Sequence, residues 1–429
     1  MQIATLIIAI VTVLGIICST IFFPILKIKK VKLSTFYLIA LLGAIILLSI
    51  KSVSIDTVWN GFTSNTSINP LKILVLFLSM TFLSIFLDAF GFFKYIANKF
   101  ANKFSKNQYT LFFGLYLIIS LLTVFTSNDI IILTFTPFIC YFAKRCNIKA
   151  LPFLIMEFVA ANTWSMCLII GNPTNIYLAT SFNVNFFDYF LKMIIPTIFA
   201  SITSLLILFL VFRKQLKAPI TLKVEENETI EKLPVIFGVI VLSLATITLA
   251  ISSYIKLEMW YMALGYAAIL LLFLITYSII KKTNYVFNVI KRLPWNLIPF
   301  VLSMFVIVLS LNSQNILDYI SSFLLKFNNT FSFGLSGAIM ANLINNIPMS
   351  VLYSVILNGA TSKAMYASII ASNIAAYITP IGALAGIMFM ELTKSLDSKI
   401  SFLEFLKYGV LIGIPTIIIS ITVLEYIVL

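Results

Sequence analysis

The feature that most restricts this chain is a series of apolar segments of about 20 residues, such as 3–23, 71–90 and 259–280. Within a bilayer, a segment of this length satisfies its backbone polar groups only as a helix or in a closed barrel. Hydrophobic residues form 61% of the chain and charged residues 10%, against about 45–50% and about 25% in soluble proteins. The sequence therefore predicts an all-α polytopic protein of the cell (plasma) membrane, surrounded by the lipid bilayer.

Several functional classes lack the residues that they need. The sequence has no histidine, and its four cysteines show no metal-ligand spacing. The net charge is +14, but the basic residues lie in short loops between apolar segments, where they set topology. We find no nucleophile–base pair and no paired carboxylates. The sequence argues against an enzyme, a cofactor, a resident metal and a nucleic-acid partner.

Charge asymmetry predicts two halves of opposite orientation. Lysines at positions 27, 29, 30 and 32 follow the first apolar segment and place that loop in the cytoplasm. Two amphipathic stretches, 91–106 and 312–329, hold equivalent places in the two halves, and only the first is rich in lysine. We expect inverted repeats at 1–212 and 233–429, joined by a cytoplasmic linker at 213–232. The ten expected spans are 3–23, 33–50, 71–90, 151–180, 191–212, 234–252, 259–280, 297–311, 363–390 and 402–429.

Each half also contains an apolar segment that polar residues interrupt. Ser127, Asn128 and Asp129 separate 109–126 from 130–143, and the tip at 345–348 separates 331–344 from 349–357. The arm 130–143 is short for a membrane span of about 20 residues. The sequence therefore predicts two re-entrant hairpins with buried polar tips.

A second pair of interruptions lies within two of the expected spans. Asn162 and Gly171 are nine residues apart in one, and Asn373 and Gly382 are nine residues apart in the other. Asparagine and glycine are poor helix formers, and Pro173 removes a backbone donor. Broken helices in corresponding halves are the best sequence pointer to the central site of a transporter.

The candidate substrate- and ion-binding residues are those of the four breaks. They are Ser127, Asn128, Asp129, Asn162, Gly171, Asn172, Thr174, Asn175, Asn345, Asn346, Asn373, Thr379 and Gly382. Their oxygens suit a hard cation, so Na⁺ at Asn128, Asp129 and Asn345 is one interpretation. Asp129 is the only acid at any break, and buried carboxylates usually lie on ion or proton pathways. The alternatives for Asp129 are H⁺ coupling, Na⁺ coupling, or a helix cap alone.

These motifs resemble the ion transporter superfamily, in the branch of arsenical pump membrane proteins and Na⁺/H⁺ antiporters with a citrate transporter-like domain. The resemblance rests on Ser127-Asn128-Asp129 with Pro137, on the run 345–350 (Asn-Asn-Ile-Pro-Met-Ser), and on the run 378–385 (Ile-Thr-Pro-Ile-Gly-Ala-Leu-Ala). It implies a scaffold subdomain and a moving transport subdomain of hairpins and broken helices, with elevator-type alternating access.

The expected function is secondary active transport by ion-coupled efflux of arsenite or antimonite. The alternative is a sodium-coupled transporter of a carboxylate or other anion, or a Na⁺/H⁺ antiporter. The run Gly171-Asn172-Pro173-Thr174-Asn175 is shared more with the carboxylate-type relatives, which keeps that alternative open. The expected partners are a small inorganic or carboxylate substrate, with a second copy of the chain and a cytoplasmic ATPase subunit as candidates.

Overall fold

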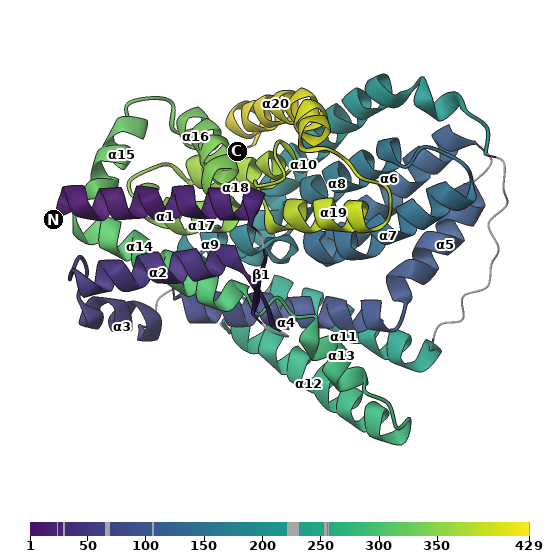
Figure 1. The fold of residues 1–429 in the computed structure, drawn as a ribbon, viewed down its shortest axis with the longest axis horizontal. Helices are drawn as coiled ribbons and strands as arrows, with labels where there is room; N and C mark the ends of the chain where they lie inside the picture. The colour runs from purple at the N-terminus through teal and green to yellow at the C-terminus, as the bar shows by residue number, and fades with distance from the viewer. Residues whose placement is uncertain are drawn as a thin grey trace.

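A computed structural model describes residues 1–428 apart from 24, 29–30, 65–68, 105–106, 221–230, 253–254 and 256. Nearly all of the described chain is helical, as the composition predicts (Figure 1). Lys29, Lys30 and the middle of the expected linker 213–232 lie outside these residues. Around that gap, the start of the linker forms the short 3₁₀ helix η2 (Gln215–Lys217).

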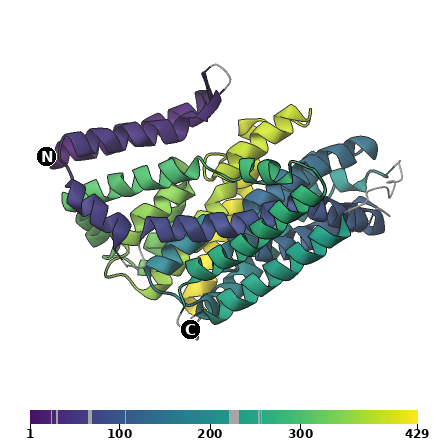
Figure 2. The same cartoon turned by 90° about the horizontal axis from the view of Figure 1, so that it is seen from below.

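Six helices form what we call the framework group, because they pack mainly against one another. They are α1 (Gln2–Phe22), α2 (Thr35–Ser49), α4 (Pro70–Ala89), α11 (Lys232–Ile251), α12 (Met259–Ile280) and α14 (Leu297–Ser313). Figure 2 shows α1, in purple, at one edge of the bundle. Many large apolar side chains of α1, α11 and α12 are exposed, as expected for helices that face lipid.

We call a second set of helices the hairpin group, because it contains the expected hairpins and the broken helices. They are α6 (Gln108–Phe125), α7 (Asn128–Arg145), α8 (Leu151–Ser165), α9 (Pro173–Ser181), α10 (Phe186–Phe212), α16 (Asn329–Ile344), α17 (Asn346–Ile356), α18 (Ser362–Ile374), α19 (Leu384–Ser395) and α20 (Phe402–Tyr426). Helices α16 and α18 pack closely together, as do α10 and α20. In Figure 1, α9, α17 and α18 lie in the middle of the bundle.

Among the described residues, seven helices are long and apolar enough to cross a membrane, or eight if α14 and the short helix α15 (Ile316–Leu324), bent by 83°, form one span. Six of the seven are spans expected from the sequence. The seventh, α6, is the first arm of an expected hairpin. The remaining expected spans are the shorter helices α2 and α14 and the broken pairs α8–α9 and α18–α19.

Three loops contain regular secondary structure that was not predicted from the sequence. The strands β1 (Ile25–Ile28) and β2 (Val31–Ser34) form an antiparallel hairpin in which residue 27 faces residue 32. Its branched apolar residues favour strands, but the lysines there were read only for topology. Helices α3 (Ile55–Thr63) and α13 (Tyr285–Lys291) occupy stretches expected to be loops. The amphipathic helix α5 (Phe92–Phe104) and α15 lie within the stretches expected for them.

The two hairpin tips are tighter than the sequence suggests. Ser127 is the N-cap of α7, whose 18 residues begin at Asn128, so Asp129 lies in the first helical turn and the arm is longer than expected. At the second tip, Asn345 caps α17 and has a φ of 75°, while Asn346 is already helical. Local side-chain caps shorten both breaks, because each satisfies a backbone N–H at the start of the following helix.

Candidate functional site

The break between α8 and α9 is held by its own side chains. The 3₁₀ helix η1 (Ile169–Gly171) connects the two helices, and the Asn175 side-chain amide donates to the carbonyl oxygens of Ser165 (2.8 Å) and Leu168 (3.1 Å). Asn172 caps α9 by accepting from the backbone N–H of Thr174 at 3.2 Å. Only glycine fits at position 171, since a Cβ there would lie 2.1 Å from the Ser165 carbonyl oxygen.

The break between α18 and α19 has a similar construction. The 3₁₀ helix η3 (Ala375–Tyr377) follows α18, and a Cβ at Gly382 would lie 2.7 Å from the carbonyl oxygen of Ala375. The Thr379 hydroxyl donates to Asn342 Oδ1 in α16 at 2.6 Å. Asn342 was not among the residues selected from the sequence, where nothing distinguishes it from a polar residue on a helix surface.

Each hairpin tip contacts the broken helix of its own half. Asn128 Nδ2 donates to Asn162 Oδ1 at 2.9 Å, and both side chains are buried. Asn345 Nδ2 donates to the carbonyl oxygen of Ile381 at 3.0 Å, and the backbone N–H of Asn346 donates to that of Gly382 at 3.0 Å.

The two broken helices contact each other through Asn373, which is fully buried. Its Oδ1 accepts from Ser165 Oγ at 2.8 Å and from Asn172 Nδ2 at 3.0 Å. Its Nδ2 donates to Asn175 Oδ1 at 2.7 Å. Hydrogen bonds therefore join the two breaks across about two hundred residues of sequence.

We call the buried uncharged residues at this junction the amide cluster. Its members are Asn128, Asn162, Ser165, Asn172, Thr174, Asn175, Ser372 and Asn373. The hydroxyls of Thr174 and Ser372 lie 2.9 Å apart. Ser165 and Ser372 were not selected from the sequence, although Ser165 lies one helical turn after Asn162 and Ser372 precedes Asn373. One acceptor in the cluster, Asn128 Oδ1, is buried and has no hydrogen-bond partner.

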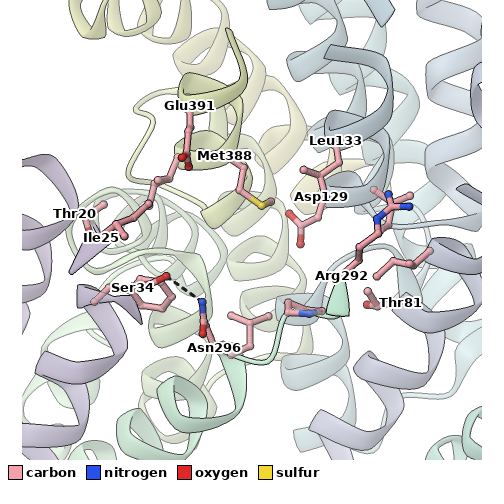
Figure 3. A pocket seen from close by; sticks show the side chains of 16 residues that line it. Thr20, Ile25, Ser34, Thr81, Asp129, Leu133, Arg292, Asn296, Met388 and Glu391 are labelled. Carbon is pink, nitrogen blue, oxygen red and sulfur yellow. Dashed lines mark hydrogen bonds between the residues drawn. The ribbon is translucent and has the colours of Figure 1, made fainter. Parts of the chain in front are cut away.

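The Asp129 side chain faces a cavity of about 240 Å³, which is lined by none of the residues of the amide cluster (Figure 3). No side chain of the described residues donates a hydrogen bond to its carboxylate. Glu391, from α19, lies on the other side of this cavity, and Thr20, Ser34 and Asn296 contribute neutral polar groups. The carboxylate of Asp129 therefore sits beside the hairpin tip and is open to an ion.

The expected Na⁺ ligands do not form one hydrogen-bonded group. Asn128 contacts the first break and Asn345 the second, while Asp129 faces the cavity. A small pocket beside Asn345 shares Thr20 and Ile387 with the cavity of Asp129. Asp129 at the first tip and Asn345 at the second therefore lie beside neighbouring pockets.

One basic side chain, Arg292, is found among the described residues that line this cavity. It follows α13 and forms an ion pair with Asp88 near the end of α4. The other carboxylate oxygen of Asp88 accepts from Thr134 Oγ1 of α7 at 2.6 Å. The sequence does not indicate this pair, because the two residues are 204 positions apart.

Another acid, Glu157 of α8, is fully buried and does not line the cavity of Asp129. The Thr136 hydroxyl lies 3.0 Å from both of its carboxylate oxygens. Its contacts tie α8 to α7 inside the hairpin group, so the structure gives it a packing position rather than a place at the breaks.

Comparisons with known proteins agree with this architecture. A family model described as "Citrate transporter" matches residues 28–369. The chain is 24% identical over 408 residues to an "Arsenical pump membrane protein" of Escherichia coli, covering 90% of this chain and 92% of that protein. It is 25% identical over 424 residues to a "Putative arsenical pump membrane protein" of Bacillus subtilis, covering 90% and 93%. It is 22% identical over 403 residues to a "46 kDa membrane protein" of Mycobacterium leprae, covering 89% and 91%.

Proposed function

The chain belongs to the citrate transporter family and is a multi-pass membrane transporter, and from this premise we propose that it extrudes arsenite or antimonite in exchange for protons. The observation that carries the proposal is the buried, uncharged amide cluster, whose member Asn128 directly precedes Asp129 at the tip of the first hairpin. The cluster consists of amide and hydroxyl groups, none of them on a charged side chain; most of these groups bond one another, and the acceptor Asn128 Oδ1 has no partner among the described residues.

The chemistry of the cargo fits such a site. Arsenous acid and its antimony analogue are neutral trihydroxides near neutral pH, and each hydroxyl both donates and accepts hydrogen bonds. Amide and hydroxyl groups match these hydroxyls without an opposite charge, and the unpaired Asn128 Oδ1 can accept one of them. A tricarboxylate would instead need basic partners for its charges.

Charges around the cavity also favour a neutral cargo. The described lining residues include the carboxylates of Asp129 and Glu391, and the one basic residue, Arg292, is already paired with Asp88. Like charges in a confined space repel, so an anion is disfavoured there. The names of the two relatives from Escherichia coli and Bacillus subtilis point to arsenical cargo as well.

Asp129 is the proposed coupling residue. It begins α7 at the tip of the first hairpin, next to Asn128 of the amide cluster, and its carboxylate faces the cavity. In the proposed cycle, the hairpin group carries the neutral cargo outward in one stroke and, after releasing it, returns inward with a proton held on Asp129. The framework group stays fixed during this exchange.

The test uses everted membrane vesicles from a strain that lacks arsenical exporters. We expect an imposed pH gradient to drive accumulation of arsenite and antimonite, with no dependence on Na⁺. Glu391→Gln is the matched control for a replacement of Asp129, because it removes a carboxylate from the same cavity but not from the hairpin tip. Na⁺-dependent uptake of citrate without any arsenite uptake would instead establish the carboxylate alternative.

A further inference from the structure

The cavity of Asp129 contains a basic group that could bind anions, yet the charge of that group is already paired with an acid. An arginine guanidinium recognises a carboxylate through two parallel hydrogen bonds, which requires its N–H groups to be free. Arg292 lines the cavity, but its Nη2 is engaged by Asp88 Oδ2.

Asp88 lies outside the lining of the cavity, and a second contact fixes the orientation of its carboxylate. Its side chain is only 13% exposed, and Asp88 does not itself line the cavity. The hydroxyl of Thr134 donates to its second carboxylate oxygen, so both oxygens have a partner. A carboxylate held at both oxygens keeps its orientation toward Arg292.

This contact joins three elements. Asp88 belongs to α4 of the framework group, Arg292 follows α13, and Thr134 belongs to α7, the helix that carries Asp129. The pair therefore forms where the hairpin group meets the framework group, and Figure 3 shows its arginine, Arg292, at the cavity.

We propose that Asp88 is a specificity-determining residue, which excludes carboxylate and other anionic cargo by occupying Arg292. This inference rests on the proposed function, because it explains how a member of the citrate transporter family favours a neutral cargo. Without Asp88, the guanidinium of Arg292 would face the cavity unpaired, and a carboxylate in the cavity could pair with it. Asp88 contacts no cargo in this scheme and acts only through Arg292.

The test measures equilibrium binding of radiolabelled citrate to the purified full-length chain in lipid nanodiscs. We compare the unaltered protein with Asp88→Asn, which keeps the shape of the side chain and removes its charge. Since a hydrogen bond to a charged group contributes about 1.5–3 kcal/mol, Asp88→Asn should bind citrate about tenfold to a hundredfold more tightly than the unaltered protein.

The double variant Asp88→Asn/Arg292→Gln is the matched control, and it should lose the gain. Thr134→Val supplies a second route, because it keeps every charge and removes the hydrogen bond that fixes Asp88. We expect a smaller gain from Thr134→Val. A gain in neither variant, or a gain that persists without Arg292, would overturn the inference.

The outcome is separable from that of the proposed function. Citrate binding by the variants is measured without arsenite, so a gain that depends on Arg292 supports the role of Asp88 even if the unaltered protein exports no arsenite. Conversely, arsenite export together with unchanged citrate binding in Asp88→Asn would leave the proposed function standing and remove Asp88 from it.

Discussion

Replacement of Gly171 by alanine is the sharpest test of the broken-helix geometry. The added Cβ would lie 2.1 Å from the carbonyl oxygen of Ser165 and 2.9 Å from its carbonyl carbon. Both are backbone atoms, so no side-chain rotation relieves the contact. The chain must separate there by about 1 Å, because interiors are close-packed and such short contacts do not occur.

The cost can be estimated from the contacts that this shift disturbs. Inserting a methyl group into a packed interior costs about 1–3 kcal/mol. The same Ser165 oxygen accepts from Asn175 Nδ2 at 2.8 Å, and losing a buried hydrogen bond adds about 1–3 kcal/mol. We therefore expect Gly171→Ala to lower the free energy of unfolding by about 2–6 kcal/mol. Transport should fall about a hundredfold, since a 1 Å displacement at a site can have that effect.

Alanine substitutions at two further glycines provide comparisons with Gly171→Ala. A Cβ at Gly382 would lie 2.7 Å from the Ala375 oxygen, so Gly382→Ala should be less harmful than Gly171→Ala. Gly265 in α12 has no atom within 4 Å of its added Cβ, and Gly265→Ala should keep or raise stability by up to about 1 kcal/mol. The measurements are the thermal unfolding midpoint in detergent and the initial rate of arsenite uptake. Equal midpoints and rates for Gly171→Ala and Gly265→Ala would refute the close contact.

Three other predictions concern the coupling residue, the amide cluster and the framework group. Asp129→Asn should abolish uptake driven by the pH gradient and spare exchange of labelled for unlabelled arsenite; full gradient-driven uptake would instead mean that Asp129 acts only at the helix start. Asn373→Ala leaves three buried polar groups without their partner, so the free energy of unfolding should fall by about 3 kcal/mol or more. An unchanged unfolding midpoint would show that Asn373 does not hold the two broken helices together. The hydrogen bond from Lys72 lowers the pKa of Glu258, so this pair stabilises the fold above the unfolded-state pKa of about 4.3 and ceases to do so as the pH falls through the lowered pKa. Because Glu258 is exposed, Glu258→Gln should cost less than about 1 kcal/mol at pH 7 and nothing once Glu258 is protonated, and a larger loss in thermal unfolding would be inconsistent with a solvent-screened pair.

The sequence alone was sufficient to predict helical class and the positions of the breaks. Apolar segments of membrane-crossing length have few alternatives to helix, and residues such as Gly171 and Pro173 interrupt a helix through their own backbone chemistry. These are local effects, so they can be read without knowledge of the rest of the chain. The exact ends of the helices were less predictable, because N-cap residues such as Ser127 extend a helix toward its break by a residue or two.

The pairing of the breaks was decided only in the tertiary structure. An asparagine side chain can pair with many groups, and nothing in the sequence selects Asn172 as the partner of Asn373, 201 residues away. The direction of the Asp129 side chain and the pairing of Asp88 with Arg292 depend likewise on how distant helices pack. Helix formation follows from neighbouring residues, whereas the site is made of contacts between segments that only the packed bundle brings together.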